Sequence, residues 1–265
     1  MKSPLKNKWV LITGASSGFG AAAATAFAAQ GARVLLGARR LDRLKKVSAA
    51  AKKAGANATH FHELDVSQTS SVETFVAWAK TLIHESSSRK LHVLINNAGG
   101  AHGVDTIATG KDEDWETMLQ TNVLGVLRVT RAALPLLPHD DGATIINIGS
   151  LAARAAYVGG SAYCAAKAGE LQLTRVLRQE LFGTGIRVST VDPGLAETEF
   201  ALVRYKGDTQ KAKELYAGAN PLVAKDIADI LVWVASRPPH VNIDEMLIKP
   251  VDQADMGKVF RRKAT

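Results

Sequence analysis

The chain has 265 residues, of which 46% are hydrophobic and 22% charged, and its formal net charge is +8 at pH 7. This length suits one large α/β domain or two small ones, and the composition is ordinary for a soluble globular protein. Apart from a short tail at Arg261–Lys263, the basic residues are spread along the chain. Because a nucleic-acid-binding surface needs a continuous basic stripe, the composition argues against nucleic acid as a partner.

Cys164 is the only cysteine, so an intramolecular disulfide is impossible and we expect a reducing compartment, the cytoplasm. We interpret its thiol as a small apolar group packed on a helix rather than as a redox site. The N-terminal segment up to Trp9 lacks the pattern of a signal peptide, and no apolar run approaches the length that spans a bilayer. We therefore expect no membrane as a partner. As a separate prediction from the sequence, we expect no metal ion.

Short apolar runs alternate with alanine-rich helical stretches along the whole chain. In chain order, the sequence predicts a strand at Trp9–Ile12, a helix at Ala21–Gln30 closed by Gly31, a strand at Arg33–Leu36, a helix at Leu41–Ala54 closed by Gly55, a strand at His60–Leu64, a helix at Ser71–Ile83, a strand at Leu91–Ile95, a helix at Asp114–Leu134, a strand at Thr144–Ile148, a helix at Ser161–Leu181, a strand at Arg187–Val191, a helix at Ala224–Ala235 and a strand at Ile243–Ile248.

This alternation predicts an α/β fold, a doubly wound, seven-stranded parallel sheet with helices on both faces, in a single domain over residues 1–265. One segment departs from the alternation of strands and helices: residues 195–221 form a long polar excursion directly after the sixth strand. Because parallel sheets bind ligands at the carboxyl ends of their strands, we expect this segment to be a lid over a substrate.

The first strand runs directly into a glycine-rich turn that opens the first helix. Glycines let the backbone approach a pyrophosphate closely, and the helix N-terminus offers free N–H groups. The spacing is Gly-x3-Gly-x-Gly rather than the usual Gly-x-Gly-x-x-Gly, but the strand before it and the helix after it match a dinucleotide site. The candidate residues of this turn are Gly14, Ser16, Ser17, Gly18, Phe19 and Gly20.

The end of the second strand indicates which cofactor is bound. A carboxylate there would accept hydrogen bonds from the ribose hydroxyls of NAD, but this chain has Arg39 and Arg40, with no acid before Asp42. Guanidinium groups suit a ribose 2′-phosphate because they bind phosphate bidentately and stack on adenine. The sequence therefore predicts NADP(H).

Tyr163 and Lys167 lie four residues apart, which on a helix places both side chains on one face. A neighbouring ammonium favours the phenolate, and the upstream hydroxyl of Ser150 can hold a substrate oxygen, as reversible carbonyl–alcohol chemistry requires. Taken alone, a Tyr-x3-Lys pair is more typical of an exposed helix face. The glycine-rich turn and the arginine pair favour the catalytic interpretation.

The order and spacing of Thr13-x3-Gly18-x-Gly20, Asn96–Gly99, Asn122, Ser150, Tyr163-x3-Lys167 and Pro193-Gly194 resemble the short-chain dehydrogenase/reductase family over nearly the whole chain. The resemblance implies that Tyr163 is the general acid/base, that Lys167 holds the nicotinamide ribose and lowers the tyrosine pKa, that Ser150 binds the substrate oxygen and that Asn122 supports a proton-relay water. It further implies that the cofactor contacts Asp65, Val66, Asn97, Ala98, Gly99, Pro193, Gly194, Leu195 and Thr198.

Several segments, among them Gly37–Arg40, Thr198–Phe200 and Val203–Asp208, resemble a narrower branch, the NADP-dependent 3-hydroxy acid dehydrogenases. That branch includes serine or L-allo-threonine dehydrogenases, malonic semialdehyde reductases and sulfoacetaldehyde reductase. A small anionic substrate is the implied class. Arg204 in the lid is the preferred clamp for its carboxylate or sulfonate, Tyr157 is expected to line the pocket, and Arg154 is expected to face solvent.

Three other functions remain open from the sequence: a reductase of a bulkier ketone or acyl substrate on the same fold, a non-catalytic NADPH-sensing regulator, and a nucleic-acid binder. The complete Asn122, Ser150, Tyr163 and Lys167 set argues against the regulator. Family members are commonly tetramers that pair the helices carrying Asn122 and Tyr163, so the resemblance implies a homo-oligomer.

Overall fold

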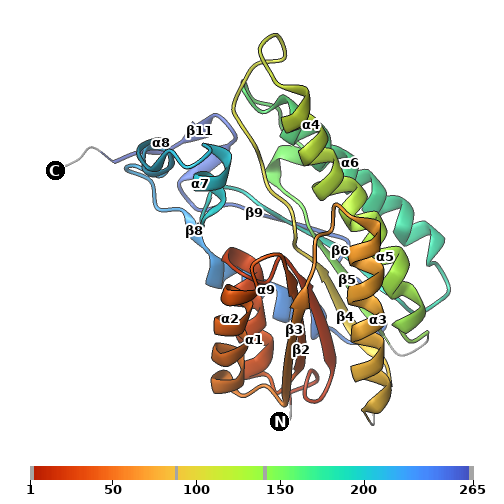
Figure 1. Ribbon diagram of the computed structural model, residues 1–265. Coiled ribbons are helices and arrows are strands. Elements are labelled where there is room, and N and C mark those ends of the chain that lie inside the picture. Colours follow the sequence, from red (N-terminus) through yellow and green to blue (C-terminus); the bar gives the residue numbers. More distant parts are fainter. Residues whose placement is uncertain (1–2, 87–88, 140–141, 263–265) are drawn as a thin grey trace.

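A seven-stranded sheet, parallel throughout, forms the centre of the computed structural model, which describes residues 3–86, 89–139 and 142–262 (Figure 1). Lys263 of the basic tail and the first two residues of the N-terminal segment lie outside the described residues. The strand order is β3-β2-β1-β4-β5-β6-β9. The strands are β1 (Trp9–Thr13), β2 (Arg33–Ala38), β3 (Ala58–Glu63), β4 (Leu91–Asn96), β5 (Thr144–Ile148), β6 (Arg187–Pro193) and β9 (Glu245–Ile248).

Helices cover both faces of this sheet, as the alternating pattern predicts (Figure 1). On one face α1 packs against both α2 and α9; on the other α3 packs against α5, and the shorter α4 (Asp112–Leu119) packs against α6. The six principal helices are α1 (Gly18–Ala29), α2 (Leu41–Ala54), α3 (Thr69–Glu85), α5 (Gly125–Ala133), α6 (Ser161–Glu180) and α9 (Ala224–Ala235). The prediction of a doubly wound parallel sheet is confirmed.

Each face of the sheet buries its own apolar cluster. Phe27 of α1 is fully buried in the cluster shared with α2 and α9, and Phe75 of α3 is fully buried in the opposite cluster. The central strand β1 is buried at every position because both of its faces are covered, which explains why its sequence is a continuous apolar run. The expected helix end at Gly55 is confirmed: this residue caps α2 with a φ of 114°, a left-handed conformation that glycine adopts without strain.

The single long helix predicted over Asp114–Leu134 is wrong. The structure has an α-helix α4 (Asp112–Leu119), a π-helical turn (Gln120–Leu124), the α-helix α5 and a 3₁₀ turn (Leu134–Leu136). The π-helical turn carries Asn122, whose side-chain amide hydrogen-bonds to the backbone of Gly100 and to the Met118 carbonyl. A wide helical turn inserts one extra residue, a distortion that is frequent at functional sites. Periodicity alone does not reveal it.

The excursion at 195–221 is more ordered than a polar loop. It contains a two-residue strand β7 (Ala196–Glu197), two short helices, α7 (Phe200–Arg204) and α8 (Thr209–Glu214), and is tied down where β7 pairs with β8 (Leu222–Val223). A hairpin of β10 (Gln253–Asp255) and β11 (Lys258–Val259) follows β9. In Figure 1 these elements lie together beyond one end of the sheet. Within the described ranges, no helix is long and apolar enough to cross a membrane.

Candidate active site

One cleft lies at the carboxyl ends of the strands, and we name it the central cleft. Its walls come from the turn after β1, the ends of β2 and β4, the segment after β3, helix α6 and the segment 195–221, for which we keep the name lid. Fifteen of the predicted cofactor residues line it: Gly14, Ser16, Ser17, Gly18, Phe19, Arg39, Arg40, Asp65, Val66, Asn97, Ala98, Gly99, Tyr163, Lys167 and Thr198. The fold thus brings together residues that are up to 184 positions apart, from Gly14 to Thr198.

The glycine-rich turn and the start of α1 are arranged to receive an anion. Gly14 has a φ of 64°, and a Cβ there would lie 2.8 Å from the Cα of Ala98, so neither the conformation nor the space admits a side chain. Helix α1 has no side-chain cap and no acidic residue in its first turn, which leaves its N-terminal dipole uncompensated. Gly20 does not line the cleft; it lies behind the turn, where a Cβ would meet the Asn97 side chain.

The arginine pair stands at the rim of this turn. Both Arg39 and Arg40 are exposed and line the central cleft. The Arg40 guanidinium donates to the hydroxyls of Ser16 and Ser17 and forms an ion pair of 3.1 Å with the Glu199 carboxylate. Sequence reasoning missed Arg43, which donates to both Glu199 oxygens at 2.5 and 2.7 Å. Glu199 therefore joins the lid to the arginines beside the turn.

Asn97 fixes the end of β4 against β1. Its backbone N–H donates to the Thr13 hydroxyl at 3.0 Å, and its side-chain amide donates to the Thr13 carbonyl at 2.8 Å. Asp65 lines the cleft, and one of its carboxylate oxygens accepts from the backbone and hydroxyl of Ser67. These hydrogen bonds fix the end of β4 to the end of β1 and order the segment after β3, so that the walls of the cleft keep their relative positions.

Pro193 ends β6 and Gly194 and Leu195 follow it, but none of the three lines the central cleft. Their backbone donors are engaged within the protein: Gly194 N–H donates to the Ile248 carbonyl at 2.7 Å and Leu195 N–H to the Gln253 side chain at 2.7 Å. Gln253 is buried and orients this segment, a role that no motif indicates.

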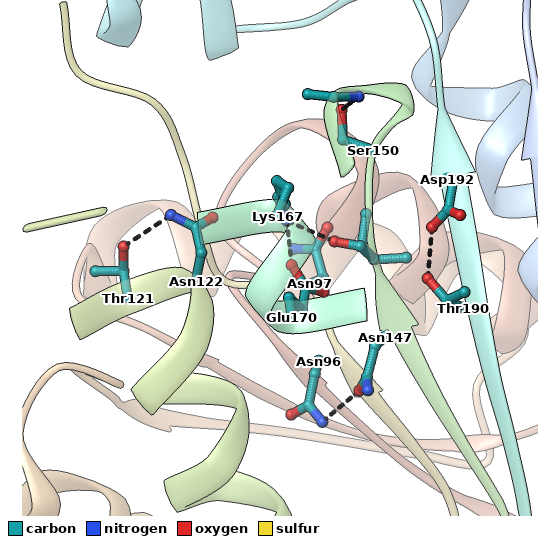
Figure 2. Close-up of polar contacts among 12 residues, drawn as sticks. Asn96, Asn97, Thr121, Asn122, Asn147, Ser150, Lys167, Glu170, Thr190 and Asp192 are labelled. Atoms are coloured by element: carbon teal, nitrogen blue, oxygen red, sulfur yellow. Dashed lines mark hydrogen bonds and ion pairs between the residues drawn. The ribbon is translucent and has the colours of Figure 1, made fainter. Parts of the chain in front are cut away.

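Tyr163 and Lys167 lie on one face of α6 as predicted, with the Lys167 Nζ 6.0 Å from the centre of the Tyr163 ring. The ammonium donates to the Ile148 carbonyl at the end of β5 at 2.7 Å and to Glu170 Oε2 at 2.6 Å (Figure 2). Burial lowers the pKa of Lys167, but the charges of Glu170 and Tyr163 outweigh it and raise the pKa above its ordinary value. Lys167 is therefore an ammonium at neutral pH, as its predicted role requires.

Asn122 and Ser150 lie on two other elements beside Lys167 (Figure 2), although neither is among the residues that line the central cleft. A Cβ built on Gly99 would lie 2.5 Å from Asn122 Oδ1 and 3.9 Å from Lys167 Nζ, so the two side chains face the same point of the cleft. Ser150 follows β5 and caps the short 3₁₀ turn Leu151–Ala153, which packs on α6. Its Oγ accepts from the Ala152 N–H at 3.1 Å, and its own proton remains free to be donated.

Arg204 is buried, with 9% of its surface exposed, and its guanidinium lies close to two tyrosine rings. The expectation that Tyr157 lines the pocket needs correction, because neither Tyr157 nor Arg204 is among the residues that line the central cleft or the side cavity. The Arg204 Cζ atom is 5.1 Å from the centre of the Tyr157 ring and 6.0 Å from that of Tyr163. One nitrogen donates to the Gly159 carbonyl, while Arg204 Nε and the Tyr157 hydroxyl are buried without a hydrogen-bond partner in the described chain. Burial raises the pKa of Tyr157 to about 12, with Arg204 opposing the rise, so this hydroxyl stays protonated.

The expectation that Arg154 faces solvent needs correction. The residue as a whole is exposed, but its guanidinium turns inward and pairs with Asp192 at 2.5 Å and with Glu245 at 2.7 Å. Asp192 is fully buried, and an unpaired carboxylate there would be costly. Arg154 is therefore committed to this network.

A second, smaller cavity lies on the other side of Tyr163, and we name it the side cavity. It has a volume of about 20 Å³ and is lined by His102, Gly103, Asp105, Gly110, Lys111, Asp114, Trp115, Met118, Gly159, Ser161, Ala162 and Tyr163. Phe200 of α7 lines the central cleft and packs 5.4 Å from the Tyr163 ring. Sequence reasoning assigned no role to His102, Trp115, Phe200 or Glu170, because no spacing links them to the motifs. No cluster of three or more potential metal ligands occurs in the described ranges.

A parallel α/β sheet with a glycine-rich turn, an arginine rim and a Tyr–Lys pair in one cleft defines a nucleotide-dependent oxidoreductase. The family model described as short chain dehydrogenase matches residues 8–208. The chain belongs to the short-chain dehydrogenase family, and the resemblance noted from its motifs is confirmed.

The chain is 38% identical over 263 residues to an NADP-dependent 3-hydroxy acid dehydrogenase of Schizosaccharomyces pombe, covering 99% of this chain and 100% of that protein. It is 42% identical to a sulfoacetaldehyde reductase of Chromohalobacter salexigens, covering 92% of this chain and 94% of that protein. A solved closed form of serine dehydrogenase complexed with NADP+ has 37% identity and a TM-score of 0.86, with 96% of this chain and 100% of that chain covered. The predictions of the fold, of an oxidoreductase and of NADP(H) as cofactor are confirmed by these relatives.

Proposed function

We propose that the protein transfers a hydride between NADP(H) and the carbon that bears the hydroxyl or carbonyl of a small 3-hydroxy acid, semialdehyde or short sulfo-aldehyde. The observation that carries the substrate class is the buried Arg204 guanidinium, which has no carboxylate partner among the described residues. Buried charges are normally paired. A carboxylate or sulfonate of the substrate would supply the missing partner, and the Tyr157 hydroxyl would donate to the same anion.

The residues of the central cleft fit NADP(H). The uncapped start of α1 and the Gly14 turn suit the pyrophosphate, Asp65 suits the adenine, and Arg39 and Arg40 suit the ribose 2′-phosphate. The Glu199 carboxylate that now pairs with Arg40 is the group that a 2′-phosphate would replace. When bound, the cofactor supplies or accepts the hydride.

The side chains of this protein then handle the proton. In reduction, Tyr163 Oη donates its proton to the carbonyl oxygen as the hydride arrives at carbon; in oxidation, the phenolate accepts the hydroxyl proton. Lys167 makes the phenolate accessible through its positive charge. Ser150 donates a hydrogen bond to the substrate oxygen, keeps its own proton, and so holds that oxygen opposite Tyr163. Asn122, fixed by its bonds to Gly100, anchors the water through which the Tyr163 proton is exchanged.

The side cavity favours a small substrate over a bulky one. At about 20 Å³ it holds about one water molecule beside Tyr163, and the half-buried Trp115 and the buried Met118 line it. A bulky ketone or acyl chain would need both side chains to move. A non-catalytic regulator on this scaffold would have no need of the complete Asn122, Ser150, Tyr163 and Lys167 set.

The test is a steady-state comparison of carbonyl substrates with NADPH: malonic semialdehyde, sulfoacetaldehyde and a hydrophobic ketone of similar reactivity. We expect kcat/KM for one of the two anionic aldehydes to exceed that for the ketone by at least about 100-fold, the selectivity that one buried charge pair supplies. Oxidation of a panel of 3-hydroxy acids is measured in parallel with NADP+ and NAD+. A preference for the hydrophobic ketone would overturn the proposed substrate class.

A further inference from the structure

The Lys167 ammonium has a second charged neighbour that the reaction scheme does not use. Glu170 lies one turn further along α6, its side chain is 2% exposed, and its Oε2 accepts from Lys167 Nζ at 2.6 Å. The other oxygen, Oε1, is buried without a hydrogen-bond partner among the described residues. An incompletely satisfied buried carboxylate is costly, so stability alone gives no reason for placing it there.

The surroundings of Glu170 contain few other charges. On α6 itself it faces Lys167, with Tyr163 one turn further back; from β6 it faces Asp192, which is paired with Arg154 and accepts from the Thr190 hydroxyl. The π-helical turn brings the neutral Asn122, and β5 brings the neutral Asn147 (Figure 2). The Asn147 amide donates to the Thr174 hydroxyl. Lys167 is thus the one cation in contact with Glu170 in the described part of the chain.

The geometry makes the charge that Tyr163 experiences depend on Glu170. Lys167 Nζ is 6.0 Å from the centre of the Tyr163 ring, and an uncompensated positive charge so close to a phenolate in the protein interior has a strong electrostatic effect on it. An ionised Glu170 at 2.6 Å from the same nitrogen cancels most of that effect. A protonated Glu170 leaves it intact.

We propose that Glu170 is a positioning residue for the Tyr163–Lys167 pair, which holds the ammonium against the Ile148 carbonyl and, by gaining or losing a proton, sets how much of the Lys167 charge acts on Tyr163. This inference rests on the proposed role of Tyr163 as the acid/base. Burial raises the pKa of Glu170 to about 7, with Lys167 opposing the rise, so the carboxyl changes its charge near neutral pH.

The consequence is a particular shape of the pH profile. In alcohol oxidation, kcat/KM rises with pH because the general base must be deprotonated; as Glu170 ionises, it cancels part of the Lys167 charge and makes that rise less steep. The wild-type rise is therefore broader than a one-proton curve and requires two ionisations.

The experiment measures kcat/KM for oxidation of the best 3-hydroxy acid with NADP+ from pH 5.5 to 10. In Glu170→Gln the amide keeps the shape but carries no charge, and we expect a one-proton curve displaced to lower pH by about one to two units. Glu170→Asp keeps a carboxylate and is expected to restore the two-step profile. Glu180→Gln, the same change at an exposed position of α6, is the matched control and is expected to overlay the wild type.

Three outcomes decide the proposal. A Glu170→Gln profile that merely scales the wild-type curve at every pH, with a lower melting temperature, shows an ion pair for stability only and overturns it. A one-proton curve in the wild-type enzyme overturns it as well and needs no variant, so a Glu170→Gln protein that fails to fold does not remove the test. Tyr163→Phe separates the two proposals: if that variant stays active, the proposed mechanism fails; if it is inactive and Glu170→Gln overlays the wild type, only the role of Glu170 fails.

Discussion

Replacing Arg204 tests the substrate class most selectively. Its guanidinium is buried between Tyr157 and Tyr163, with Nε unpartnered in the described chain, and Gln at this position retains hydrogen-bonding capacity but no charge. Removing one partner of a buried charge pair costs about 3 kcal/mol of binding, which corresponds to a loss of about 100-fold in kcat/KM. We expect that loss only for substrates that carry an anion.

The assay compares an anionic aldehyde with an uncharged aldehyde of similar size, using wild type, Arg204→Gln and Lys211→Gln. Lys211 lies in α8 of the same segment, is exposed and among the described residues pairs with Asp208 alone, so its replacement makes the same charge change away from the tyrosines. For Arg204→Gln we expect kcat/KM to fall about 100-fold for the anionic aldehyde and less than about 10-fold for the uncharged one. Lys211→Gln is expected to change neither by more than about 2-fold.

Equal losses for both aldehydes would refute the reasoning, because they would mean that Arg204 supports the lid through its bond to the Gly159 carbonyl and does not bind the substrate anion. Arg204→Lys adds a check on geometry. It keeps the charge but has no Nε, and we expect it to recover only part of the selectivity for the anionic aldehyde.

Three further predictions concern the cofactor and the stability of the fold. In Arg39→Gln, KM for NADP+ rises about 10-fold or more while KM for NAD+ changes less than about 3-fold, as measured by initial rates; equal changes would place the 2′-phosphate elsewhere. Gly14→Ala introduces a Cβ 2.8 Å from the Ala98 Cα at a positive φ and is expected to abolish NADPH binding, as measured by fluorescence titration; unchanged affinity would contradict the predicted role of the turn. Hydrogen bonds from Arg175 and Arg154 hold the pKa of Glu245 at about 2, below its ordinary 4.5, so this carboxylate stabilises the fold above pH 4.5 and stops doing so as the pH falls toward 2. Glu245→Gln therefore lowers the melting temperature at pH 6 and the difference shrinks below pH 4.5; a constant difference would exclude this linkage.

Most of the sheet can be predicted from the sequence, because buried parallel strands are recognisable as continuous apolar runs. Seven strands and most helices lie within a few residues of the predicted positions, and Gly55 ends α2 where the sequence indicates. The failure at Asp114–Leu134 has a physical reason. Gly100 and Asn122 are distant in sequence, and their hydrogen bonds stabilise a π-helical turn that the local periodicity does not encode.

In the candidate site too, local motifs could be predicted from the sequence, whereas contacts between distant segments could not. The glycine-rich turn and the Tyr163–Lys167 pair are local motifs, and their residues meet in one cleft as predicted. Contacts between side chains that are distant in the sequence could not be predicted from local motifs. Glu199 pairs with Arg40 across 159 positions, and Arg154 pairs with the Asp192 carboxylate 38 positions away. Glu170 is only three residues from Lys167 in the sequence. Its burial beside the Lys167 ammonium, on which its proposed role depends, follows only from the packing of α6 in the fold.

The most direct test of the central claim, that Tyr163 transfers the proton that accompanies hydride transfer, is turnover of Tyr163→Phe. The variant loses one hydroxyl and keeps the ring that packs on Phe200, so the fold and the central cleft are expected to persist. We expect NADPH to bind within about 3-fold of the wild-type Kd while kcat falls by at least about 100-fold, the contribution of a positioned general acid. A Tyr163→Phe enzyme that binds NADPH and turns over at the wild-type rate would contradict the account.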